Sequence, residues 1–176
     1  MKKVLFCLVV TLTLVGCKQK KEEVADIRST GVEHFRDLYE DFVSPDGRVY
    51  AFFFDIDGDG VDEAFTVGSK MINRDGNDWR TWHYQDGKWQ KPKGEELANF
   101  LYAYTEDIYY RDDVKQQPRL FAADCDVASP ASISLTKDRY LVVAPFDKAE
   151  FDRLKAKGIL KPVEAHWYDK DNKIVQ

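Results

Sequence analysis

Residues 49–67 read VYAFFFDIDGDGVDEAFTV, an acidic stretch between two apolar ones. Asp55, Asp57 and Asp59 stand at alternate positions, and Gly60 follows them where a sharp turn leaves no room for a side chain. Carboxylate oxygens that converge in this way are the donors a hard divalent cation prefers. The acidic side chains also repel one another by roughly 1 kcal/mol per neighbouring pair even in water, so a bound cation would order the loop. The spacing therefore predicts a calcium loop.

The sequence on either side of this loop predicts a strand, a loop and a second strand. Residues 49–54 are mostly aromatic and follow the turn-forming run Ser44-Pro45-Asp46-Gly47, which favours a strand over an entering helix. Residues 64–67 again have strand-forming character. An EF-hand would carry a bidentate glutamate at the twelfth loop position, where this chain has Thr66.

The loop resembles the calcium loops of FG-GAP and VCBS-type repeats and of integrin propeller blades, whose pattern is D-x-[DN]-x-D-G-x-x-[DE]. The resemblance implies side-chain ligands at Asp55, Asp57, Asp59 and Glu63. The backbone carbonyl of Val61 is expected to contribute as well, and Asp62 to point away or to lie behind the ligands. A propeller needs several blades and this sequence has one copy, so the motif is carried over and the propeller is not. The alternative is a solvated acidic turn without metal.

The N-terminal sequence predicts where in the cell the protein is located. Lys2 and Lys3 precede an apolar run from Val4 to Val15 that is too short to span a bilayer, and Leu14-Val15-Gly16-Cys17 follows. This stretch resembles the lipobox of bacterial lipoproteins, which implies cleavage after Gly16 and lipidation of Cys17. Two or three acyl chains would anchor the protein in the membrane at about 0.8 kcal/mol per buried methylene. In a Gram-negative cell, Lys18 at the next position would imply the outer membrane. An ordinary secretory peptide and a membrane helix are the alternatives.

Charge and length then limit the class of protein. The chain has 26 basic and 31 acidic residues, so removing Lys2 and Lys3 with the signal leaves 24 − 31, a net charge of −7. Such a charge argues against nucleic acid as a partner. We expect a signal peptide at 1–16, a lipidated tether at 17–29 and a single globular calcium-binding domain at 30–176.

The rest of the chain predicts an α+β domain, a mainly antiparallel sheet built from hairpins with about three packed helices. Thr30-Gly31-Val32-Glu33 has the form of a capping box before a first helix. Leu97, Phe100, Leu101 and Tyr104 have helical spacing and predict a second, and Asp147 with Glu150 begins a third that ends at Gly158. Hairpins are expected around Asp86-Gly87, 136–139 and 169–172.

No catalytic residue is predicted. Three histidines lack the spacing of a zinc site, and Cys125 stands between two aspartates whose charges oppose thiolate formation. Trp82, Tyr84 and Trp89 would share one face of a hairpin, where a core role is favoured over a sugar-binding platform. We therefore expect a calcium-binding, lipid-anchored envelope protein with a non-catalytic binding or structural role, whose partner is an envelope protein or a glycan. The alternative is an envelope hydrolase or a glycan-processing or glycan-binding protein that uses the calcium-stabilised hairpin.

Overall fold

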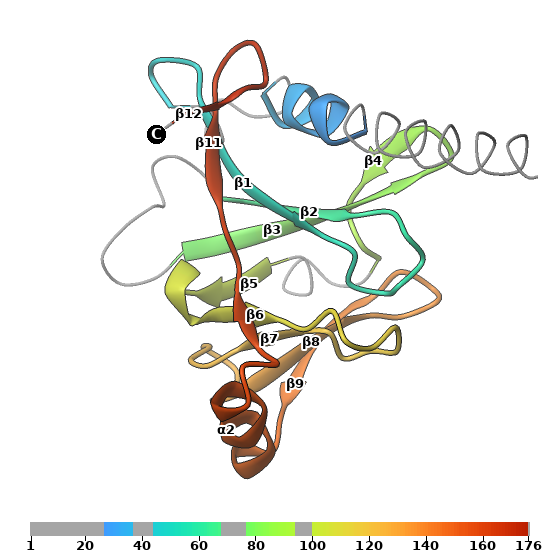
Figure 1. Ribbon diagram of the computed structural model, residues 1–176. Coiled ribbons are helices and arrows are strands. Elements are labelled where there is room, and N and C mark those ends of the chain that lie inside the picture. Colours follow the sequence, from blue (N-terminus) through green and yellow to red (C-terminus); the bar gives the residue numbers. More distant parts are fainter. Residues whose placement is uncertain (1–26, 37–43, 68–76, 94–99, 176) are drawn as a thin grey trace, which may run out of the picture.

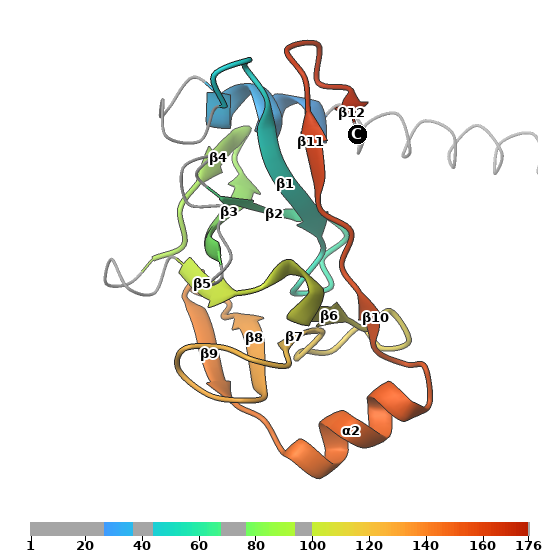
Figure 2. The same ribbon diagram turned by 90° about the vertical axis from the view of Figure 1, so that its left-hand side faces the viewer.

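The computed structural model describes residues 27–36, 44–67, 77–93 and 100–175, and Figures 1 and 2 show them from two sides. Residues 27–36 are helical. The elements that follow are β1 (Val49–Phe54), β2 (Glu63–Val67), β3 (Asn77–Gln85), β4 (Lys88–Gln90), β5 (Phe100–Ala103), η3 (Thr105–Asp107), β6 (Ile108–Tyr110), β7 (Leu120–Ala122), β8 (Ala131–Leu135), β9 (Leu141–Pro145), α2 (Lys148–Ala156), β10 (Lys161–Pro162), β11 (His166–Tyr168) and β12 (Ile174–Val175).

The first sheet has the strand order β12, β11, β1, β2, β3, β4, and β5 pairs with β3 beside this path. Its centre is the antiparallel hairpin of β1 and β2, in which Phe52 lies opposite Phe65 and Phe54 lies opposite Glu63. On its other side β1 pairs with β11 from near the end of the chain, where Ala51 lies opposite His166. The acidic loop therefore joins two strands that are paired up to its ends.

The second sheet has the strand order β10, β6, β7, β8, β9. The chain runs from β10 directly into β11, so its C-terminal part passes from the second sheet to the first, as the long red segment in Figure 1 shows. Hairpin β8–β9 closes where Leu135 lies opposite Leu141. A bridge between Lys93 and Tyr140 places the tip of this hairpin beside the chain that leaves β4 in the first sheet.

The main hydrophobic core lies between the two sheets. Phe52, Phe65 and Trp79 from the first sheet form one buried cluster with Leu120 and Ile133 from the second. Phe52 and Phe65 stack with their ring centroids 4.5 Å apart. Side chains alternate along a strand, so the neighbours of these residues point to the outer face of each sheet and need a second cover.

A helix covers the outer face of each sheet. The helix at 27–36 packs Val32 and Phe35 against Trp82 and Trp89 of the first sheet, and these two tryptophans are only 2% and 6% exposed. Helix α2 packs Phe151 and Leu154 against Phe121 of the second sheet. The order of layers is thus helix, sheet, sheet, helix, which Figure 1 shows from top to bottom.

Several predictions of local structure are confirmed. The acidic loop joins two strands, and Tyr84 lies opposite Trp89 in hairpin β3–β4. Asp147 caps α2, because its side chain accepts a hydrogen bond from the backbone N–H of Glu150. The tryptophans of the β3–β4 hairpin belong to a core, as expected, and do not form an exposed platform.

The prediction of about three helices is wrong for the described residues, which contain two α-helices. Residues 100–103, expected in a second helix, form β5 and pair with β3. Leu101 and Ala103 are buried and Tyr102 is half-buried, so a period of two prevails over the helical spacing. The predicted helix residues at 38–42 and Leu97 lie outside the described residues.

The predicted capping box is also wrong. Residues 27–29 are already helical, and the Thr30 hydroxyl donates a hydrogen bond back to the carbonyl of Ile27. Thr30 therefore lies within the helix, although Val32 and Phe35 face the core as the spacing predicted. The lipobox and Cys17 lie outside the described residues.

Candidate metal centre

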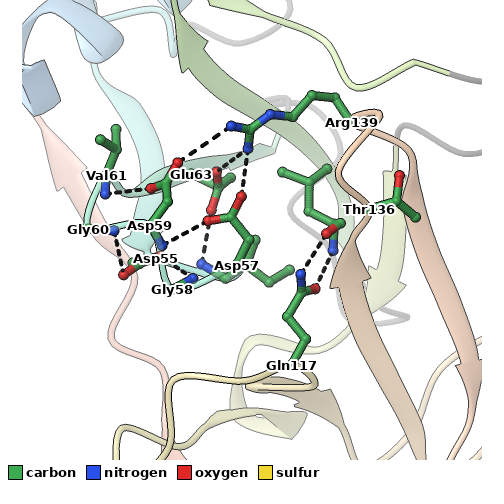
Figure 3. A network of polar contacts seen from close by, with 12 residues as sticks. Asp55, Asp57, Gly58, Asp59, Gly60, Val61, Glu63, Gln117, Thr136 and Arg139 are labelled. Carbon is green, nitrogen blue, oxygen red and sulfur yellow. Dashed lines mark hydrogen bonds and ion pairs between the residues drawn. The ribbon is translucent and has the colours of Figure 1, made fainter.

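The acidic loop runs from Asp55, directly after β1, to Glu63, the first residue of β2. Its aspartate side chains accept hydrogen bonds from backbone N–H groups a few residues further along the loop, as short acidic side chains do in turns. Asp55 accepts hydrogen bonds from the N–H groups of Gly58 at 2.7 Å and Gly60 at 3.1 Å. Asp59 accepts one from Val61 at 2.8 Å. The loop thereby curls around the Asp55 carboxylate, as Figure 3 shows.

Glycine is required at Gly58 for two reasons. Its φ of +80° lies in the left-handed region, which side chains disfavour. A Cβ atom there would also lie 2.3 Å from the backbone oxygen of Lys115. The loop is therefore packed tightly against the chain that leads into β7, and only a residue without a side chain fits this contact.

Three carboxylates converge inside the loop. Asp55, Asp57 and Glu63, named here the acid cluster, each place one oxygen within 4.8 Å of the others' oxygens, and this group could hold a metal ion. All their side-chain donors are carboxylate oxygens, which suit a hard cation.

Glu63 is the most unusual member of the acid cluster, because its residue is only 2% exposed. Burial, together with the charges of the nearby aspartates, raises the pKa of the Glu63 carboxyl to about 9, although a hydrogen bond from the N–H of Ile56 acts in the opposite direction. That hydrogen bond reaches Oε2 at 2.9 Å. Burial and the charge of Asp59 also raise the pKa of Asp57. A hydrogen bond from the Asp59 N–H and the charge of Arg139 lower this pKa, but by less. A buried carboxylate of this kind is stable as an anion only beside a cation.

Two arginines from distant parts of the chain contact the acid cluster. Arg139, in the turn between β8 and β9, places Nη1 2.7 Å from Oδ2 of Asp57 and 3.8 Å from Oε1 of Glu63. Arg119 donates a hydrogen bond to the backbone oxygen of Asp55 and lies 3.3 Å from its Oδ2. The sequence pattern gave no sign of either arginine, since the nearest acidic partner lies more than sixty residues away in both cases.

The structure thus brings together three of the residues that the loop pattern singled out. Asp59 lies at the rim, 41% exposed at its side chain, with Oδ2 3.4 Å from Nη2 of Arg139. Asp62 turns to Arg28 in the N-terminal helix, at 2.6 Å from Nε. The N–H of Val61 donates a hydrogen bond to the Asp59 carboxylate. The carbonyl of Val61 is the group that the loop pattern assigns to a metal.

His83 and Cys125 do not belong to the acid cluster. His83 is buried, and burial lowers its pKa. Cys125 is a free thiol that is half-buried and packs against the main core. Among the described residues, no helix is both long and apolar enough to cross a bilayer.

Neither a protein-family model, nor a curated protein, nor a solved structure matches this chain. A tight acidic loop with a buried carboxylate at its centre can coordinate a cation and order the hairpin.

Proposed function

We propose that this chain is a calcium-binding, lipid-anchored protein of the bacterial cell envelope with a non-catalytic binding or structural role. The observation that carries the calcium site is the buried Glu63 carboxylate, which meets Asp55 and Asp57 in a loop of the spacing that calcium loops use. A divalent cation would compensate the charges that burial and mutual repulsion disfavour.

Calcium fits this donor set better than magnesium. Calcium accepts six to eight oxygen ligands in a flexible geometry, whereas magnesium requires a near-octahedral site and keeps several waters. The acid cluster supplies three carboxylates, and Asp59 and the Val61 carbonyl stand next in the loop to complete the shell. A site of many oxygens on a loop, without a rigid octahedral frame, therefore selects the larger ion.

Thermal unfolding of the full chain in mild detergent tests this proposal. About 2 mM calcium should stabilise the fold by roughly 1 to 2 kcal/mol over chelator if the dissociation constant lies near that of other extracellular modules, about 10⁻⁴ to 10⁻³ M. Magnesium should do less. Asp57→Ala should remove most of the calcium increment, because Asp57 belongs to the acid cluster.

Asp62→Ala is the matched control, because Asp62 lies in the same loop but pairs with Arg28. This variant should keep the calcium increment even if its metal-free stability falls. Absence of calcium binding at millimolar concentration in calorimetry, or equal losses of the increment for Asp57→Ala and Asp62→Ala, would refute the calcium assignment.

The lipid anchor is supported by the lipobox Leu14-Val15-Gly16-Cys17. Cys17→Ser should abolish metabolic labelling with palmitate and release the protein from the membrane fraction. Cys125→Ser serves as the control and should leave both unchanged, since Cys125 lies within the fold. Labelling that persists in Cys17→Ser contradicts the anchor.

Glycan binding is a second candidate for the envelope role, and one observation favours it. A cleft of about 350 Å³ opens beside the end of β1, between the two sheets. Aromatic rings line it at Phe53, Phe54, Tyr110 and Tyr168, together with polar groups at Arg28, Asp62, Glu164 and His166. Aromatic faces beside hydrogen-bonding groups suit a ligand that has both apolar and hydroxyl surfaces.

Titration with neutral envelope oligosaccharides, followed by calorimetry, tests this second candidate. Tyr168→Ala should weaken binding, because Tyr168 lines the cleft. Tyr140→Ala removes an exposed tyrosine elsewhere and should leave binding unchanged. Equal affinities for the two variants would place any glycan outside the cleft.

A further inference from the structure

Arg139 reaches the acid cluster from the opposite sheet. Its Nη1 atom lies 2.7 Å from Oδ2 of Asp57 and 3.8 Å from Oε1 of Glu63, so one nitrogen stands between two members of the acid cluster. Its Nη2 atom lies 3.4 Å from Oδ2 of Asp59. Figure 3 shows the guanidinium facing these three carboxylates. The guanidinium of Arg139 therefore lies beside the carboxylates that a bound metal ion would contact.

The fold holds Arg139 in this place through several contacts. Gln117 fixes the end of β8, because its side-chain amide makes both hydrogen bonds to the backbone of Leu135, each at 2.6 Å. The carbonyl of Arg139 accepts a hydrogen bond from the N–H of Lys93. Arg139 also has a φ of +66°, a left-handed conformation that is strained for an arginine. This conformation belongs to the turn between β8 and β9, in which the N–H of Arg139 donates a hydrogen bond to the carbonyl of Thr136.

We propose that Arg139 is an internal cation that competes with the metal for the acid cluster and thereby sets the affinity of the site. This inference rests on the proposed function, since it assigns a regulator to the same metal site. A metal ion cannot take Oδ2 of Asp57 and Oε1 of Glu63 while Nη1 lies beside both oxygens, and two cations at that separation repel each other. Metal binding therefore requires the guanidinium to withdraw.

The withdrawal connects the metal site to the second sheet. Arg139 is at the tip of hairpin β8–β9, whereas the acidic loop belongs to the first sheet. When the metal displaces the guanidinium, the tip loses the ion pairs that join it to the acidic loop. Metal occupancy thus loosens the tip of hairpin β8–β9 while it orders the acidic loop.

Calorimetric calcium titration of the full chain in detergent tests the competition. Arg139→Asn removes the charge, and asparagine tolerates a left-handed backbone. It should bind calcium about tenfold more tightly than the unchanged chain, which corresponds to about 1.4 kcal/mol. Arg111→Asn is the matched control, because Arg111 pairs with Asp113 and not with the acid cluster. It should bind calcium as the unchanged chain does.

The outcomes separate this inference from the proposed function. If the unchanged chain binds calcium and Arg139→Asn binds it no more tightly, the competition is refuted and the calcium site stands. If neither protein binds calcium, the proposed function is refuted and the competition with it. An equal gain in Arg111→Asn would show a general charge effect and also overturn the role of Arg139.

Hydrogen exchange on the unchanged chain provides a test that needs no variant. The N–H groups of Arg139 and Tyr140 donate to Thr136, through its carbonyl and its hydroxyl, and so report on the tip of the hairpin. Saturating calcium should speed their exchange several-fold relative to chelator. Amides of the paired strands at Ile133 and Val143 are the internal control and should not change. Slower exchange at the tip in calcium would mean that Arg139 stays docked, which contradicts the proposal.

Discussion

Glu63→Gln should change how the stability of the metal-free protein depends on pH. The substitution keeps the shape of the side chain and an oxygen that accepts the Ile56 N–H, but it removes the titrating group. Glu63 is 2% exposed, and burial raises its pKa from 4.5 in the unfolded chain to about 9 in the fold. The folded chain therefore holds a proton that the unfolded chain has released, over the range between these two values.

The sign and size follow from this difference in protonation. A raised carboxyl pKa contributes stability that is fully present below pH 4.5 and is lost as the pH rises toward about 9. The loss amounts to about 1.4 kcal/mol per pH unit, so between about pH 5.5 and about pH 7.5 it reaches about 3 kcal/mol. Glu63→Gln should lack this loss, and contributions from groups such as His83 cancel in the difference between the two proteins.

Urea unfolding in chelator at a series of pH values measures this difference. Glu106→Gln is the control, because Glu106 is exposed and its replacement should leave the pH dependence over this range unchanged. If Glu63→Gln and the unchanged protein lose stability in parallel over this range, Glu63 is ionised in the metal-free fold. Burial would then not hold the Glu63 carboxyl in its neutral form.

Three further substitutions, the first with a matched control, test the packing. Gly58→Ala should destabilise the metal-free protein by about 2 to 4 kcal/mol, because its Cβ would meet the Lys115 oxygen at 2.3 Å. Its control, Gly47→Ala, has φ +83° and open space, so it should lose only about 1 to 2 kcal/mol. Similar melting temperatures for the two variants would contradict the tight contact at Gly58. Cys125→Ala should lose about 1 kcal/mol or less, and rapid labelling of the native thiol would contradict its packed position. Trp82→Ala should lose about 3 to 5 kcal/mol in urea unfolding, and a small loss would show that Trp82 is not core.

Local sequence signals predicted the hairpins and one helix well. Asp86-Gly87 closes β3–β4, and Asp147 caps α2, because turn and cap chemistry depends on residues that are close in the chain. The second predicted helix failed because Leu101, which has helical spacing with Leu97 and Tyr104, also alternates with Ala103 at the period of a strand. Pairing of β5 with β3, which a local pattern does not contain, decided between them.

The part of the candidate site that is local in the sequence was predictable, and the part that comes from a distant segment was not. The spacing of Asp55, Asp57 and Glu63 is local, and the structure brings these three together. Arg139 was not predictable, because it reaches Asp57 across a separation of 82 residues and lies in a turn without a distinctive pattern. The stacking of two sheets with a helix on each outer face also depends on contacts between distant segments, so the sequence predicted antiparallel hairpins but not their division into two layers.

The pairing of β1 with β11 has a consequence for the unfinished chain. β1 is the uncharged segment VYAFFF, and among the described residues its outer edge pairs with residues 166–168, which are made more than one hundred residues after β1. Until β11 arrives, an aromatic strand presents open backbone groups, the feature that promotes association between strands of different molecules. Chains that end before His166 should therefore aggregate, and a nascent chain should need protection by a chaperone until residues 166–168 are available.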